Sequence, residues 1–121
     1  MMRPLIFSVS LLFGALSAHA SSGGRVAVTC DSFPFSDVVK VELVETDLEG
    51  QLFARETLAS GETRDLYAMI NASDVEAGQA IRLSDWNGYT RTLYRSGAGA
   101  YQVVTQDECS SAISFVACSE R

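Results

Sequence analysis

Asp85-Trp86-Asn87-Gly88-Tyr89 is the stretch that decides the fold, because Asn-Gly stands there between two runs of alternating apolar and polar residues. A two-residue hairpin loop needs positive φ at both loop positions, and Asn followed by Gly tolerates this well. The stretch therefore predicts a β-hairpin formed by residues 79–86 and 89–95. With a two-residue loop, Trp86 faces Tyr89 and Ile81 faces Tyr94 across the hairpin.

The period of two continues on both sides of this hairpin. Further extended segments are predicted at 25–30, 38–46, 51–58, 64–70, 100–106 and 112–118, and one helical turn at 73–78. Turn signals recur every 8 to 12 residues or so, roughly the spacing typical of sandwiches and barrels, and no long helical pattern is present. The sequence therefore predicts an all-β fold, a small antiparallel β-sandwich or barrel of about eight strands.

The first twenty residues are typical of a secretory signal peptide. Arg3 gives a positive start, residues 5–16 form an apolar run, and Ala18-His19-Ala20 places small side chains at a cleavage site. We expect a cleaved signal peptide at 1–20, a flexible leader at 21–24, a single β domain at 25–118 and a tail at 119–121. The apolar run is shorter than the ~20 residues that span a bilayer, so we expect no membrane insertion and a periplasmic or secreted location.

Composition describes one small domain and excludes several classes of function. The chain has 121 residues, of which 47% are hydrophobic, and carries a single His. Without residues 1–20 it loses Arg3 and His19 and keeps 8 basic against 15 acidic side chains, a net charge of −7. A chain without imidazole lacks Ser-His-Asp and Cys-His catalysis and histidine-ligated zinc, and an acidic chain is poorly suited to nucleic acid. We predict a protein that is not an enzyme and that needs no cofactor or metal.

Three cysteines in an oxidising compartment predict one disulfide and one free thiol. If 112–118 is extended, Cys109 and Cys118 lie up to about 30 Å apart, too far for a bond unless the segment loops back. Cys30 is then the expected partner of one of them. Antiparallel pairing of the first and last strands would bring Cys30 near the start of the last strand, which favours a Cys30–Cys109 disulfide and leaves Cys118 free.

The predicted hairpin also carries the candidate binding surface. In the predicted register one of its faces gathers arginines and aromatics in an otherwise acidic chain: Arg82, Trp86, Tyr89, Arg91 and Arg95. Aromatic rings stack on sugars or apolar side chains, and guanidinium groups bind carboxylates or phosphates, which predicts a protein or glycan partner. One alternative is a self-contained ladder in which the arginines stack on the aromatic rings and no ligand is needed. Another is that this face is the buried one and that the arginines lie at its rim.

The function predicted from these features is a non-catalytic binding or structural role. The alternative is an acidic inhibitor of a cationic extracellular enzyme, a lysozyme or protease, because a net charge of −7 would steer a basic partner. Cys30 and the stretch from Ser96-Gly97 to Tyr101 resemble the periplasmic lysozyme-inhibitor lipoproteins. Tyr101 is one place out of step with that pattern and the lipobox is missing, so the resemblance transfers no residue role.

Overall fold

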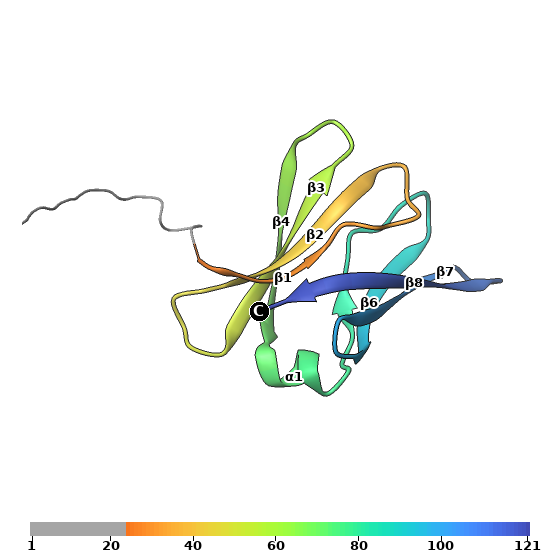
Figure 1. Cartoon of the computed structure of the whole chain (residues 1–121). Coiled ribbons are helices and arrows are strands. Elements are labelled where there is room, and N and C mark those ends of the chain that lie inside the picture. Colours follow the sequence, from red (N-terminus) through yellow and green to blue (C-terminus); the bar gives the residue numbers. More distant parts are fainter. Residues whose placement is uncertain (1–23) are drawn as a thin grey trace, which may run out of the picture.

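The computed structural model describes residues 24–121, apart from the side chains of Tyr67 and Ala68. The predicted signal peptide and residues 21–23 of the predicted leader lie outside the described residues. Figure 1 shows a strongly curled antiparallel sheet with one short helix at one end. The elements are β1 (Val26–Cys30), β2 (Val38–Glu45), β3 (Gln51–Leu58), β4 (Thr63–Asn71), α1 (Ala72–Glu76), β5 (Ile81–Arg82), β6 (Thr90–Gly97), β7 (Ala100–Gln106) and β8 (Ser111–Glu120).

The sheet does not close into a full barrel, because its two edge strands do not pair with each other. The eight strands follow the order β4-β3-β2-β1-β8-β7-β6-β5, and every pair is antiparallel. The first and last strands pair in the middle of the sheet, whereas β4 and β5, which follow each other in the chain, are its two edges. The prediction of an all-β fold with eight antiparallel strands is confirmed, and its form is an open half-barrel.

The core lies on the concave face of the half-barrel. Strand residues alternate between the two faces of a sheet, so every second position of the longer strands points inward. From α1, Val75 packs against the same core, which places the helix across one end of the half-barrel. The buried apolar side chains include Val28, Val41, Leu43, Leu52, Ala54, Ile81, Leu83, Leu93, Tyr101, Val103 and Val116.

The disulfide joins Cys30 to Cys118, so the predicted Cys30–Cys109 bond is wrong. The two α-carbons lie 4.3 Å apart on directly opposed positions of β1 and β8. β1 pairs only with the last three residues of the long strand β8, whose beginning pairs with β7 alone, and Cys109 is exposed in the β7–β8 turn. The bond fits an oxidising compartment. β8 also continues through Ser119 and Glu120, two residues of the predicted tail.

The Asn-Gly hairpin forms, but its register shifts by one residue beyond the loop. Trp86 and Tyr89 face each other as predicted. The Trp86 amide nitrogen lies 3.0 Å from the Tyr89 carbonyl oxygen, and the Tyr89 amide nitrogen lies 2.8 Å from the Trp86 carbonyl oxygen. Ile81, however, faces Leu93 and not Tyr94. An additional residue therefore lies on the β5 side between Leu83 and Trp86, and a slip of one residue turns a strand's side chains to the opposite face. This shift moves β6 side chains that were predicted to point outward into the core.

Candidate functional site

Among the predicted site residues, Arg91 differs most from its expected position, because the register shift turns its side chain into the interior. Its side chain is 1% exposed, and Nη1 and Nη2 donate to the two carboxylate oxygens of Asp37, each at 2.9 Å. Nε donates to the Ser84 carbonyl at 3.0 Å, and the guanidinium lies 4.7 Å from the ring centroid of Phe35. The Arg91 hydrogen bonds hold the pKa of Asp37 below its ordinary value. Arg91 therefore anchors the connection between β1 and β2 inside the half-barrel and is not available to a ligand.

A second buried charge completes this interior network. The Glu56 side chain is fully buried and accepts hydrogen bonds from Arg64 Nη2 at 2.9 Å, the Ser84 amide at 3.1 Å and the Ser84 hydroxyl at 2.7 Å. Ser84 thus connects Glu56 on β3 and Arg64 on β4 to the segment that follows β5. The network links the two sides of the open seam, where no strands pair, and its role is structural.

The other predicted site residues are divided between two places. Arg82 donates to Asp85 at 2.7 Å, and both side chains are more than half exposed. Trp86, 39% exposed, stays at the hairpin tip beside Tyr89, and their part in a protein or glycan site stays a prediction. Arg95 lies at the other end of β6. The five residues therefore do not form one surface.

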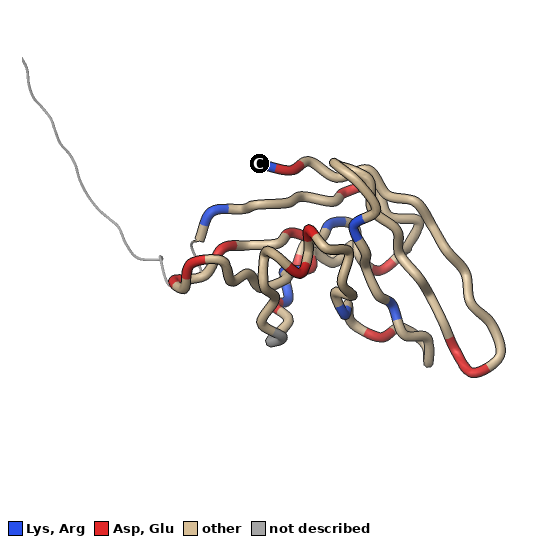
Figure 2. The backbone as a smooth tube through the Cα atoms, turned by 90° about the horizontal axis from the view of Figure 1, so that it is seen from below, with Lys and Arg blue, Asp and Glu red and all other residues tan. Residues whose placement is uncertain are grey.

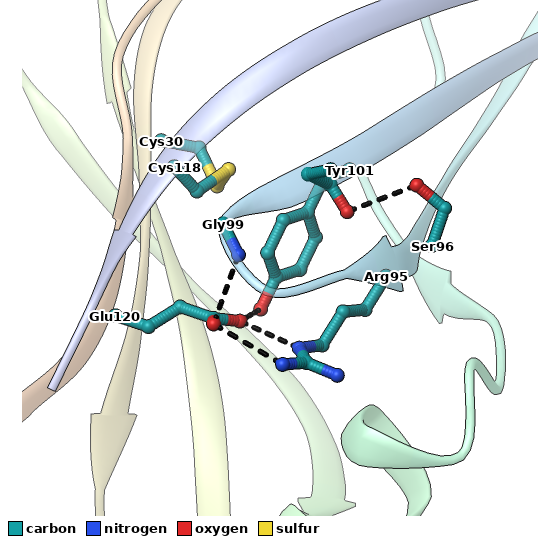
Figure 3. Close-up of a disulfide and its surroundings, with 8 residues drawn as sticks. Cys30, Arg95, Ser96, Gly99, Tyr101, Cys118 and Glu120 are labelled. Carbon is teal, nitrogen blue, oxygen red and sulfur yellow. Dashed lines mark hydrogen bonds and ion pairs between the residues drawn. A yellow bond between two sulfur atoms is a disulfide. The ribbon is translucent and has the colours of Figure 1, made fainter.

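Arg95 belongs to a cluster built around Glu120, next to the disulfide (Figure 3). The Glu120 carboxylate accepts hydrogen bonds from Arg95 Nε at 2.7 Å, the Tyr101 hydroxyl at 2.7 Å and the Gly99 amide at 3.0 Å. The Arg95 hydrogen bonds are the main reason that the pKa of Glu120 is lowered to about 2. Burial, and then the hydrogen bond to Glu120, raise the pKa of Tyr101. The cluster ties β6, β7 and β8 together.

This cluster forms one wall of a cavity of about 490 Å³ at the α1 end of the half-barrel. The volume lies within the roughly 300 to 1,000 Å³ of small-molecule sites. The cavity is bounded by the start of β1, the β2–β3 turn, α1 and the end of β8. Its apolar lining comes from Ala27, Val28, Leu48, Leu52, Ala72 and Val75.

The mouth of the cavity is acidic. Glu49 in the β2–β3 turn and Glu76 in α1 line it, and neither forms an ion pair within residues 24–121. The Ala72 amide donates to the Gly50 carbonyl at 2.8 Å, which holds α1 against that turn. The basic residues at the cavity are Arg25 and Arg95, which are paired with Glu45 and Glu120, and Arg121. Arg121 also forms no ion pair within residues 24–121, so the unpaired side chains of the lining are two acids and one base, which gives them a net negative charge.

Charge pairing over the whole described chain shows the same bias. Seven of the eight basic residues of 24–121 form ion pairs, each with a different acid, and eight of the fifteen acids form none. Half of these eight lie in the β2–β3 turn and α1, beside the cavity, and the acidic tip of the long β7–β8 hairpin stands far from them (Figure 2). The eight acids are Asp31, Asp47, Glu49, Glu62, Asp74, Glu76, Asp107 and Glu108.

A wider, more open groove of about 810 Å³ lies where the half-barrel fails to close. It is lined by residues 62–66 of the β3–β4 hairpin together with Leu58, Arg82 and Leu83. Its charges are largely paired, since Arg64 and Arg82 bond to Glu56 and Asp85. The smaller cavity, with free acids at its mouth, is the better candidate site.

Comparison with protein-family models, with characterised proteins and with solved structures found no significant match. Within residues 24–121 there is no helix with the length and apolar character needed to cross a membrane. The same residues contain no group of three or more His, Cys, Asp or Glu side chains placed to hold a metal ion. The candidate site therefore stands on its geometry.

Proposed function

We propose that this chain is a non-catalytic binding protein of the periplasm or the secreted medium, and that its cavity receives a positive charge carried on an apolar stem. Such a group is the side chain of Lys or Arg presented by a basic partner protein. One observation carries the proposal, a cavity of about 490 Å³ that is lined in part by apolar side chains and has the exposed, unpaired Glu49 and Glu76 at its mouth. The apolar stem would be removed from water while the charge meets carboxylates at the opening.

The state of Glu120 decides where the ligand's charge would lie. This carboxylate also lines the cavity, but Arg95, Tyr101 and Gly99 already donate to it. A second cation there would compete with Arg95 for oxygens that are already hydrogen-bonded. The charge of a ligand is therefore favoured at the mouth, beside Glu49 and Glu76, and its apolar part deeper in the cavity.

The titratable groups of the cavity support a non-catalytic role. A general acid or base works best with a pKa near the operating pH. Here the pKa of Glu120 is lowered to about 2, and burial raises that of Tyr101 above its ordinary value of 10.0, so both move away from neutrality. The chain also has no His after residue 20.

Titration calorimetry with hexylammonium, and with hexanoate as the charge-reversed probe, tests this proposal. We expect saturable binding of hexylammonium and none of hexanoate. Converting Glu49 and Glu76 together to Gln should weaken hexylammonium binding about tenfold, or about 1.4 kcal/mol. The matched control converts Glu62 and Glu108 to Gln, which removes the same charge away from the cavity and should leave binding unchanged. Equal losses in both variants, or equal binding of both probes, would contradict the proposal.

A second candidate, inhibition of a cationic extracellular enzyme, is supported by the eight acids that form no ion pair. Free negative charge steers a basic partner and gives an association that weakens with salt. The test is the activity of a basic lysozyme or protease in the presence of this chain at low and high salt. We expect inhibition that declines with salt and with the Glu49 and Glu76 substitutions. Full enzyme activity at an excess of the chain would exclude this candidate and leave the cavity proposal to its own test.

A further inference from the structure

The first seven residues of β8 form an open edge in the middle of the sheet. Within β8, only Cys118, Ser119 and Glu120 pair with β1, so residues 111–117 have β7 on one side and, within the described chain, no strand on the other. β8 begins at the tip of a hairpin that extends well past the end of β1 (Figure 1). The edge of a sheet presents unpaired N–H and C=O groups that another strand can bond.

The backbone hydrogen bonds of β8 show which residues face this open edge. The Cys118 amide donates toward β7, to the Gly99 carbonyl at 2.8 Å, and the Arg121 amide donates toward β1, to the Ala27 carbonyl at 2.9 Å. Backbone groups of successive residues in an antiparallel strand point to alternate sides. Residues 111, 113, 115 and 117 therefore direct their N–H and C=O groups toward the open edge.

This edge lacks the features that normally keep strand edges apart. Residues 111–117 are Ser-Ala-Ile-Ser-Phe-Val-Ala, with no charged residue, no Pro and no Gly. Natural edges are protected by charges, prolines, bulges or short strands. The sheet's two outer strands follow that rule, since β4 carries Arg64 and Asp65 and β5 has two residues. On the outer face of β8, Ile113 is 58% and Phe115 78% exposed.

We propose that two copies of this chain associate through these edges, β8 against β8, antiparallel about a twofold axis at Ser114. In that register Ile113 of each copy faces Phe115 of the other, and Ser111 faces Ala117. Every position that points to the open edge then meets another such position, so the N–H and C=O groups on both sides gain partners. Ser114 faces Ser114 at a pair without hydrogen bonds, and the four exposed apolar side chains form one ladder on the outer face.

A second copy of the chain is the partner that best fits the open edge of β8, because residues 111–117 are complementary to themselves in an antiparallel pairing. A strand that is uncharged and complementary to itself needs no other partner sequence, and its apolar outer residues meet each other. At about 3.3 Å per residue, the acidic tips at Asp107 and Glu108 lie some 40 Å apart at opposite ends of the paired strands, well beyond the Debye length. Both copies are acidic overall, so added salt should strengthen this dimer, whereas it should weaken binding of a basic partner.

Disulfide trapping tests the register. Cys30 and Cys118 are an existing opposed cross-strand pair with α-carbons 4.3 Å apart, and S114C, in a C109S background, would place two thiols in the same relation across the twofold axis. The matched control is A112C on the same face, whose two copies lie about 13 Å apart in the proposed dimer, beyond disulfide reach. We expect a covalent dimer from S114C and none from A112C in glutathione buffer. Equal cross-linking of both would overturn the register.

Sedimentation equilibrium tests the association itself. We expect the wild-type chain and C109S to dimerise reversibly and F115K to stay monomeric, because the substitution places a charge in the apolar ladder. The control is L48K, at another exposed apolar residue, in the β2–β3 turn, which should dimerise like the wild type. Circular dichroism checks that both variants are folded. A wild type that is monomeric at every concentration and salt, or an F115K that dimerises as well as L48K, would overturn the proposal.

Discussion

Arg91 on β6 makes three contacts with the β1–β2 connection and one with the segment that follows β5. Its guanidinium donates to both oxygens of Asp37 and to the Ser84 carbonyl, and it lies over the Phe35 ring. In R91M the partly buried Asp37 loses its cation and the Ser84 carbonyl loses a donor. Breaking such a pair from one side costs about 3 to 5 kcal/mol. R91K should recover little, because an ammonium cannot donate in this fork geometry.

Urea unfolding measures this loss, and R82M is the control. Arg82 is also ion-paired, with Asp85 at 2.7 Å, but both side chains are more than half exposed. An exposed pair of this kind contributes about 0 to 1 kcal/mol. Similar unfolding free energies for R91M and R82M would show that the buried network does not stabilise the fold.

The Glu120 carboxylate makes the free energy of unfolding depend on pH. Its ordinary pKa of 4.5 falls to about 2 in the folded chain, mainly because of the Arg95 hydrogen bonds and then those from Tyr101 and Gly99. Unfolding below pH 4.5 therefore takes up a proton, and the stabilisation, complete above that pH, is lost as the pH falls toward 2. Urea unfolding across this range should show a shallower decline for E120Q than for the wild type. The free energy of unfolding of E49Q, which disrupts no ion pair, should fall with pH as that of the wild type does. An equally steep fall for E120Q would contradict the assignment of the pH dependence to Glu120.

At the scale of single elements, the period-two pattern predicted where strands lie better than which way their residues face. The strands and the Trp86–Tyr89 pairing follow from alternation and from the Asn-Gly loop, both of which are local. The sequence does not reveal the residue that shifts β5 against β6. A similar irregularity between Val38 and Lys40 turns Val39 outward, 44% exposed, and Val38 inward, whereas regular alternation from the buried Val41 would turn Val39 inward. Bulges depend on partner strands, and a single segment does not show them.

The Asn-Gly loop gives the prediction at this scale. Gly88 has φ of 82° and Asn87 of 49°, so both loop positions are left-handed. G88A should destabilise the protein by about 1 kcal/mol, because Ala is strained there. Gly97 lies in β6 without a positive φ and with no atom within 4 Å of an added Cβ, so G97A should be neutral or slightly stabilising. Thermal unfolding compares the two, and equal destabilisation would mean that the loss in G88A does not come from the loop's backbone.

At the scale of the whole molecule, the cavity depends on contacts that no local pattern contains. Its lining combines Arg25, Ala27 and Val28 with residues 120–121, at opposite ends of the described chain, and with the β2–β3 turn and α1. Only the pairing of β1 with β8 brings these segments together. The same pairing determines the disulfide, and the local pattern favours the wrong cysteine because it does not show how far β8 extends beyond β1. The candidate site was therefore missed, apart from Arg95, which was predicted for a different surface.

The Cys30–Cys118 bond should contribute more to stability than any other single link, because it joins the two halves of the sheet where β1 and β8 pair over only three residues. It closes a loop with a sequence separation of 88, for which chain entropy gives about 4 to 5 kcal/mol. C30A/C118A should lose stability of that order in urea unfolding, whereas C109S, which removes an exposed free thiol, should match the wild type. Because Ala27, Glu120 and Arg121 line the cavity beside this joint, the double variant should also bind hexylammonium more weakly under conditions where it is still folded. Wild-type stability in the double variant would mean that the β1–β8 hydrogen bonds alone hold the half-barrel together.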